Sequence, residues 1–147
     1  MGNVTSNTAT FLPTIPLITI PPVGQTAVGG ATVTINATGV GLPTLAYQWL
    51  VNGVVIPNGG RFNGATTPSL VITSVQGSDA GNYTLQVSNS NGNVTSTPAL
   101  LQISASIGAA PANQTVTVGD NAKLTVAADG SGTVLYQWYF NLSLIHI

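Results

Sequence analysis

Charged residues are scarce in this chain, and basic residues are the scarcer kind. Of its 147 residues only three are Asp and two are Lys or Arg, so the charged fraction is 3% and the net charge −1. A soluble domain typically carries about 25% charged residues. This composition excludes the basic surface that nucleic acids and anionic membranes require, so no nucleic-acid partner is expected. The surface must consist of Ser, Thr, Asn, Gln and Gly, which leaves little for salt to screen.

Cysteine is absent, and no long apolar run is present. Without cysteine the chain can form neither a disulfide framework nor a thiolate metal site. No apolar stretch approaches the roughly 18 residues that span a bilayer, so no membrane insertion is expected. Residues 11–18 come nearest, but prolines interrupt them and no basic residue precedes them, which makes them a poor signal peptide.

The side chains of acid–base catalysis are also missing. There is no Glu, and Asp79, Asp120 and Asp129 lie in different parts of the chain, so paired carboxylates for glycoside hydrolysis are excluded. The single histidine, His146, lies in the last six residues, and we assign it no place in a Ser-His-Asp set. No Gly-rich phosphate loop opens a helix. We therefore expect no enzymatic activity, no cofactor and no metal site.

The most informative feature that is present is an internal repeat. The tripeptide Tyr-Gln-Trp occurs at 47–49 and again at 136–138, a spacing of 136 − 47 = 89 residues. A period of this length corresponds to one small β-sandwich domain, whereas helical-hairpin repeats are about half as long or shorter. The sequence therefore predicts tandem domains of one kind.

Short strands and turn signals fill the repeat. Residues 32–37 and 84–89 alternate apolar and polar side chains, which is the period of a half-buried strand. The dipeptides Asn52-Gly53 and Asn91-Gly92 are strong hairpin signals. No segment of useful length has the 3.6-residue period of a helix. Short strands with turns every 8–12 residues predict an all-β fold, an antiparallel sandwich.

The landmarks on these strands resemble an immunoglobulin domain of the I-set type. Trp49 lies 14 residues after Ile35, and Tyr83 falls just before the sixth strand at the position of the tyrosine corner. The resemblance implies Greek-key topology and places Ile35 and Leu85 where the family usually has two cysteines. Two buried aliphatic side chains supply about 1.5–3 kcal/mol each. A native disulfide is worth about 2–5 kcal/mol, so packing on Trp49 can replace it.

The repeat pattern and the resemblance together predict the core. The expected core residues are Ile35, Trp49, Leu70, Ile72, Tyr83, Leu85, Val87, Val126 and Trp138. The resemblance also implies that Arg61 and Asp79 form a structural ion pair that closes one end of the sandwich.

The repeat also predicts the domain organisation. Residues 2–6 and 92–96 are identical, so 1–15 are expected to be the last strand of a preceding repeat. One complete immunoglobulin-like domain is expected at 16–104, and 105–141 are expected to be the first strands of a further, truncated domain. Residues 142–147 depart from the repeat and match a sequencing adapter read-through. We expect 105–141 to be unstable alone, because an isolated partial sheet is marginal.

This organisation is typical of a cysteine-free tandem-repeat protein, and we expect the chain to be a fragment of a larger bacterial one. The expected role is a non-catalytic stalk or spacer, with a part in adhesion, on a secreted or cell-surface protein. Its expected partners are the neighbouring repeats of the same chain, joined end to end because the linker at 104–106 is very short. One alternative is a glycan- or protein-binding domain appended to an extracellular enzyme; another is a decoration domain of a phage structural protein.

The loops at one end of the predicted sandwich are the candidate ligand site. They comprise 39–45 and 89–93, and the candidate residues are Gly39, Leu42, Asn89, Asn91 and Asn93. Cell-surface glycans or proteins would be the ligands. Neither loop carries the Trp or Tyr that usually stacks on a sugar, because the aromatic residues of the complete repeat lie at architectural positions. The sequence therefore favours the spacer over the glycan-binding alternative.

Overall fold

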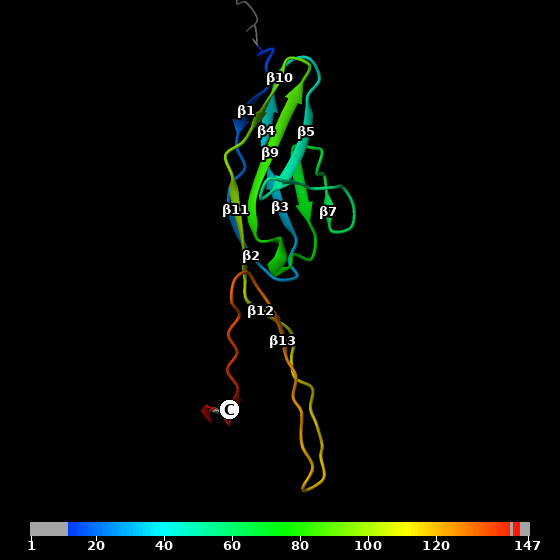
Figure 1. Ribbon diagram of the computed structural model, residues 1–147, viewed down its shortest axis with the longest axis vertical. Helices are drawn as coiled ribbons and strands as arrows, with labels where there is room; N and C mark the ends of the chain where they lie inside the picture. The colour runs from blue at the N-terminus through cyan, green and yellow to red at the C-terminus, as the bar shows by residue number, and fades with distance from the viewer. Residues whose placement is uncertain (1–11, 142, 145–147) are drawn as a thin grey trace, which may run out of the picture.

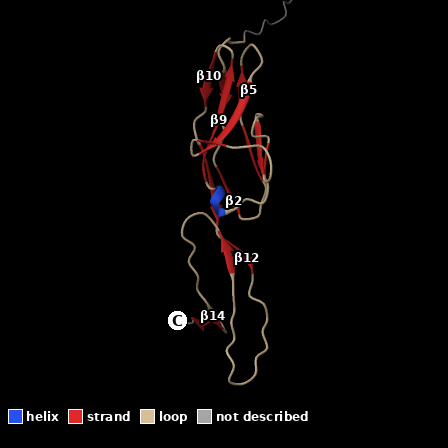
Figure 2. Ribbon diagram, turned by 45° about the vertical axis from the view of Figure 1, so that its right-hand side comes forward, coloured by secondary structure: helices blue, strands red, loops and turns tan. Residues whose placement is uncertain are grey.

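The structure, a computed structural model, describes residues 12–141 and 143–144, and the regular secondary structure within them is almost entirely β (Figure 1). The only helical element there is the 3-10 turn η1 (Gly77–Asp79), drawn in blue in Figure 2. Two regions differ in appearance: a sandwich of packed strands up to Ser104, and a C-terminal segment, 105–141, that extends below it. The all-β fold expected from the strand pattern is confirmed.

The larger sheet of the sandwich has six strands. Its main order is β2 (Gln25–Val28), β11 (Ala99–Ser104), β9 (Gly81–Asn89), β5 (Ala46–Val51) and β6 (Val54–Val55), with β10 (Gly92–Thr95) also paired to β9. All pairings are antiparallel except that of β11 with β2. The β5–β6 turn falls at Asn52-Gly53, both with the positive φ that a tight two-residue hairpin needs. The β9–β10 turn lies one residue before the second Asn-Gly signal, at Ser90 and Asn91, because Gly92 already pairs with Asn89.

The second sheet is smaller and faces the first. It has the order β3 (Val33–Asn36), β8 (Ser69–Ile72) and β7 (Phe62–Asn63), and a separate short pair joins β1 (Leu17–Ile20) to β4 (Thr38–Val40). The chain changes sheet between β3 and β5 and again between β8 and β9. These crossings place sequence-distant strands side by side, as in the Greek-key sandwich of immunoglobulin domains.

The core lies between these two sheets. Seven residues expected in it are at most 2% exposed: Ile35, Trp49, Leu70, Ile72, Tyr83, Leu85 and Val87. Trp49 is fully buried, and its indole N–H donates to the carbonyl of Thr67 at 2.9 Å. Ile35 and Leu85, at the two positions where the resemblance expects cysteines, reach the same cluster from opposite sheets. Apolar packing therefore fills the site of the missing disulfide.

The C-terminal segment has strands but no covered core. It contains β12 (Ser106–Ala109) paired with β13 (Ala127–Asp129), and it ends with β14 (Tyr139–Phe140), which pairs with β15 (Ser143–Leu144) just beyond the segment. Val126 and Trp138, placed in the core by their positions in the repeat, are only partly buried in this structure. The described residues of the segment supply no second sheet to cover them.

Two expectations about the ends of the chain fall largely outside the described residues. The strand of a preceding repeat was expected at 1–15, of which 12–15 are described, and the adapter-like tail with His146 was expected at 142–147, of which 143–144 are described. In the part of the chain that the structure describes, no helix has the length and hydropathy needed to cross a membrane.

Candidate functional site

The predicted ion pair joins Arg61, just before β7, to Asp79, the last residue of η1. The guanidinium donates to both carboxylate oxygens, with Nη2 to Oδ1 at 2.8 Å, and it also donates to the Ser74 carbonyl at 3.2 Å. The Gln76 N–H donates to Oδ2 of Asp79 at 2.8 Å. Asp79 is only 6% exposed, and a buried carboxylate needs fixed donors such as these to compensate its charge.

These contacts determine how the group titrates. Burial acts to raise the pKa of Asp79, but the hydrogen bond and charge of Arg61 and the Gln76 N–H outweigh it, and the pKa is lowered. The hydrogen bond to Asp79 likewise raises the pKa of Arg61 against the opposing effect of burial. Both groups therefore stay ionised near neutral pH, and neither is suited to exchange protons with a substrate.

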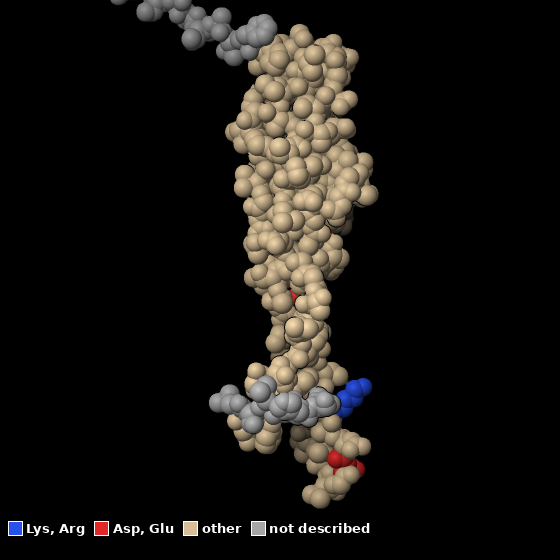
Figure 3. Space-filling view, turned by 60° about the vertical axis from the view of Figure 1, so that its left-hand side comes forward, with Lys and Arg blue, Asp and Glu red and all other residues tan. Residues whose placement is uncertain are grey.

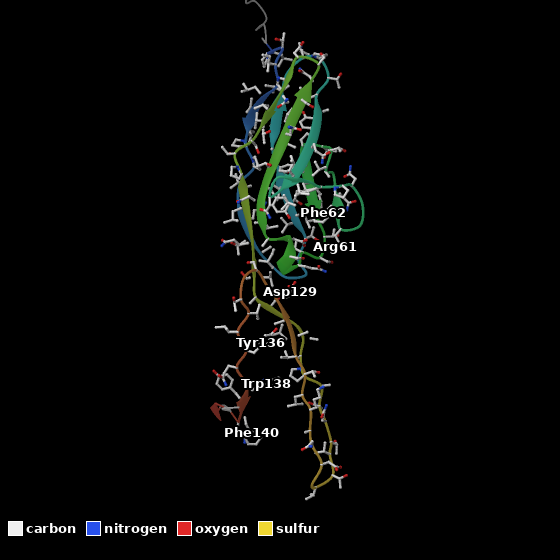
Figure 4. All side chains as sticks on the ribbon, in the orientation of Figure 1. Arg61, Phe62, Asp129, Tyr136, Trp138 and Phe140 are labelled. Atoms are coloured by element: carbon white, nitrogen blue, oxygen red, sulfur yellow. The ribbon has the colours of Figure 1, made fainter. Side chains whose placement is uncertain are left out.

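The same carboxyl residue anchors the tyrosine corner. The Tyr83 hydroxyl donates to the backbone carbonyl of Asp79 at 2.7 Å, and burial, with the nearby Asp79 charge, raises the pKa of Tyr83 to about 12. The Arg61 guanidinium also lies 5.5 Å from the ring centre of Phe62, within cation–π range, as Figure 4 allows the reader to follow. These contacts hold β7, η1 and the start of β9 together near the lower end of the sandwich, the end beside the C-terminal segment in Figure 1. The two charges contact each other directly and leave no open position for a ligand between them.

The candidate ligand loops do meet, at the upper end of the sandwich. The Asn89 side-chain amide donates to the carbonyls of Thr14 and Leu42 at 2.8 and 2.9 Å, and Asn91 reaches the same two carbonyls at 3.1 and 3.3 Å. Leu42, Asn89 and Asn91 are thus brought together, as expected, but the residue they enclose is Thr14 of the chain itself. The segment that precedes the sandwich is tied to these loops.

The other two candidate residues lie away from this contact. Gly39 is in β4, where a Cβ atom would lie 3.2 Å from a methyl group of Val87, so it packs against the core. Asn93 is exposed on β10 and makes no side-chain hydrogen bond to the described residues. Three of the five candidates therefore form a contact, and it is made within the chain.

The lower end of the sandwich carries a contact that sequence reasoning missed. The Gly77 N–H donates to both carboxylate oxygens of Asp129, at 2.9 and 3.0 Å, although 52 residues separate them. Figure 4 labels Asp129 directly beneath the sandwich. Beside it, the Ser131 N–H donates to the Ile103 carbonyl at 2.8 Å. The one available signal was that Asp129 is among only three acidic residues in the chain.

The remaining charges give no metal or cofactor site. Lys123 and Asp120 lie in the exposed outer loop of the C-terminal segment, and the face in Figure 3 is otherwise almost free of charged side chains. Among the described residues no group of three or more His, Cys, Asp or Glu is close enough to hold a metal ion. No described cluster therefore points to metal or acid–base chemistry.

A cavity of about 330 Å³ lies within the C-terminal segment. Its lining includes Val126, Leu135, Tyr136 and Trp138, with Ser106 and Gln137 as polar members. In the repeat, Trp138 corresponds to Trp49, which is fully buried in the sandwich. The cavity is therefore best explained as the uncovered inner face of an immunoglobulin-like sheet, and its apolar lining does not by itself indicate a ligand.

Comparison with known proteins gives a consistent picture. Residues 15–89 match the family described as Immunoglobulin domain. Protein turtle homolog B of Rattus norvegicus is 32% identical over 122 residues, 82% of this chain and 9% of that protein. Cell adhesion molecule DSCAML1 of Homo sapiens is 29% identical over 146 residues, 95% of this chain and 7% of that protein. The chain thus spans less than a tenth of the length of these curated relatives, which are animal proteins.

Among solved structures, the tandem Ig repeats of Dlar superpose with a TM-score of 0.59 at 25% sequence identity. The match covers 63% of this chain and 50% of that one. The share of this chain that superposes is close to the extent of the sandwich, 16–104.

Proposed function

The chain belongs to the immunoglobulin domain family, and we propose that it is a non-catalytic repeat module that spaces and supports the adhesive parts of a larger secreted or cell-surface protein. One complete domain, 16–104, carries the fold in this proposal. Residues 1–15 and 105–141 belong to the repeats before and after it. The bacterial origin expected from the cysteine-free sequence stays a prediction, since the relatives compared above are animal proteins.

One observation supports this proposal above the others: the same backbone contact occurs at both ends of the sandwich. At the upper end the Leu42 N–H donates to the Pro13 carbonyl at 2.9 Å, and at the lower end the Ser131 N–H donates to the Ile103 carbonyl at 2.8 Å. The two donors are 131 − 42 = 89 residues apart, which is the repeat period. In the proposed array, the loop that follows the β1–β4 or β12–β13 pair of each repeat contacts the chain that leads in from the repeat before it.

Ligand binding by the upper loops fits this geometry poorly. The amides of Asn89 and Asn91 are already used on the Thr14 carbonyl, and no aromatic ring from 39–45 or 89–93 is available to stack on a sugar. In a tandem array this end faces the preceding repeat. The glycan-binding alternative is therefore the weaker one.

An adhesive contribution is more easily assigned to a sheet edge. Strand β6 is the last strand of the larger sheet, and Val54 and Val55 on it are 66% and 57% exposed. An exposed apolar edge strand can pair with a strand of another protein. One of the relatives is named a cell adhesion molecule, which is in keeping with a protein partner.

Small-angle X-ray scattering of the full chain tests the spacer proposal. We expect a pair-distance distribution with the long tail of an elongated particle, because the C-terminal segment continues the long axis of the sandwich (Figure 1). A compact distribution, with the segment folded against the side of the sandwich, would contradict the proposal.

A glycan array probed with the same chain tests the alternative. We expect no reproducible signal above that of an Asn89→Ala variant, in which the upper loops are disturbed. Specific binding that this variant loses would replace the spacer with a glycan-binding function.

A further inference from the structure

The connection between the sandwich and the C-terminal segment is a single residue. Strand β11 ends at Ser104 and β12 begins at Ser106, so Ala105 alone lies between them. A single residue limits the separation of the two bodies but still leaves its backbone dihedral angles free to rotate. Whether the connection is stiff therefore depends on contacts made to either side of Ala105.

The strongest lateral contact is that of Asp129 with the backbone of η1. Gly77 is the first residue of this 3-10 turn, and N–H groups at such a position have no acceptor inside the turn. Asp129 supplies one with both carboxylate oxygens, and its Oδ1 also accepts the Gly130 N–H at 3.0 Å. A charged acceptor makes such a bond shorter and stronger than a neutral one.

The bodies also approach more closely than any side chain on Gly77 would allow. A Cβ atom on Gly77 would lie 2.1 Å from the Gly130 carbonyl oxygen and 2.8 Å from Oδ1 of Asp129. On the neighbouring turn, a Cβ on Gly29 would lie 2.8 Å from the Ser106 hydroxyl. The end of the sandwich thus has a surface, made of Gly29 and Gly77, that fits the backbone of the following segment.

A second polar contact closes the other side of the connection. The Ser131 hydroxyl donates to the Ile103 carbonyl at 2.8 Å and accepts the Ile103 N–H at 3.1 Å. Together with the Asp129 contact, it attaches the segment to the sandwich at two points, Gly77 and Ile103. Two separated attachments fix an angle, which one attachment cannot do.

We propose that the lower end of the sandwich is a docking surface for the following repeat, and that Asp129 fixes the angle between the two by binding the Gly77 N–H. The partner is the following repeat of the same chain. It carries an acidic residue, here Asp129, at the end of the strand that corresponds to β13. This inference goes beyond the proposed spacer function. It rests on that function only for the reason why a fixed angle would be useful: a stalk of defined direction needs joints of defined angle.

The upper end shows that this joint is not a general property of the fold. In the strand pairing, Leu17 faces Val40 as Ser106 faces Asp129, so Val40 is the counterpart of Asp129. A valine side chain cannot accept a hydrogen bond. The joint before the sandwich keeps the backbone contact of Leu42 but lacks the acid, and the side-chain amides of Asn89 and Asn91, which donate to the Thr14 carbonyl, make its lateral contact instead.

Distances between two spin labels on the full chain test the inference. The absence of cysteine allows unique labelling at Asn63→Cys on the sandwich and Ala109→Cys on β12, both exposed positions. We expect a narrow distance distribution in the labelled parent and a broad one after Asp129→Ala. Asp120→Ala removes the same charge from the outer loop and should leave the distribution narrow.

A second variant disturbs the same contact through the sandwich residue, Gly77, instead of through Asp129. Gly77→Ala introduces a methyl group whose nearest neighbours are Gly130 and Asp129, so the distance distribution should broaden while the sandwich stays folded. Hydrogen exchange at the Gly77 amide should become about tenfold faster in Asp129→Ala, because its acceptor is lost. An unchanged urea unfolding transition, followed by far-UV circular dichroism, confirms that the sandwich is intact in each variant.

The outcomes separate this inference from the spacer function. A distribution equally narrow in the parent and in both joint variants would show that Asp129 does not fix the angle. A broad distribution in the parent would also overturn the inference, yet an elongated scattering profile would then leave the spacer function standing.

Discussion

The two copies of Tyr-Gln-Trp have the same local sequence and opposite surroundings. Trp49 is fully buried, its backbone N–H donates to the Ala65 carbonyl at 2.8 Å, and its indole N–H donates to Thr67. Trp138 is partly exposed and lines an open cavity. Both bonds of Trp49 go to residues 16 and 18 positions further along the chain. The tripeptide therefore prepares a core position, but residues from other strands complete it.

Substitution of the two tryptophans should give the largest difference in the free energy of unfolding. Trp49→Ala removes a fully packed side chain and is expected to lower the free energy of unfolding by about 3–5 kcal/mol, the usual cost for a core aromatic. Trp138→Ala, the matched control, should leave the unfolding of the sandwich unchanged. Urea titration followed by far-UV circular dichroism measures both, and equal losses would show that the segment shares the sandwich's core.

Arg61→Ala tests whether the lower end depends on its ion pair. The substitution leaves the buried Asp79 carboxylate without its main partner and should cost about 3 kcal/mol, the lower end of the range for a broken buried pair, since the Arg61 side chain is 31% exposed. Lys123→Ala removes an exposed cation from the C-terminal segment and is the control. The same urea titration measures both variants. A loss of unfolding free energy in Arg61→Ala no larger than that in Lys123→Ala would show that the ion pair does not contribute to stability.

The acid limit of stability should reflect Asp79. Its pKa in the folded protein lies below the ordinary value of 3.8, so its ionised form stabilises the fold fully above that value. The contribution is lost as the pH falls through the lower, folded-state pKa. Thermal unfolding between pH 2 and about 6 should therefore show a steeper acid decline in the parent than in Asp79→Asn. Parallel curves for the two proteins would contradict this assignment.

A smaller effect is expected at the upper end. Asn89→Ala removes two hydrogen bonds from the contact with Thr14 and Leu42, and because the site is exposed we expect a loss of about 1 kcal/mol. Asn93→Ala, two residues beyond the turn and without such bonds, should change nothing. Hydrogen exchange in 12–16 should quicken in the first variant only; unchanged exchange in both would mean that the loops do not hold this segment.

The smallest effect is expected from salt. With five charged residues in 147 and one ion pair among the described residues, raising sodium chloride to about 0.5 M should alter the unfolding free energy by less than about 0.5 kcal/mol. Guanidinium cannot be used for this measurement because it is itself a salt, so urea is the denaturant. A larger change would reveal electrostatic interactions that the described structure does not contain.

The residues that the sequence predicted well are those whose role follows from local pattern. Alternation and spacing placed Ile35, Trp49 and Leu85 on strands whose inner faces are buried, and the resemblance paired Arg61 with Asp79. Each strand carries its own inward and outward face in its period of two. The all-β immunoglobulin-like fold could therefore be predicted from the sequence alone.

The residues that it missed depend on distant chain segments. Trp138 has the pattern of a core residue, but its burial needs strands that the described residues after it do not provide. Asp129 has no pattern at all, since its partner is a backbone N–H 52 residues away. The upper loops were predicted as a ligand site because loops often bind ligands, whereas their amides hold the preceding segment. The amide side chains of these loops indicated that they could form hydrogen bonds, but not with which residues.

Hydrogen exchange along the full chain, read by mass spectrometry, tests the central claim that one self-sufficient domain is joined to a segment that lacks the rest of its core. We predict slow exchange throughout β5, β9 and β11 and exchange near the unfolded rate in 110–125, with protection in the segment confined to residues near Asp129 and Ser131. Uniform protection from 16 to 141 would contradict the account, because it would mean that the segment folds and unfolds with the sandwich as one unit.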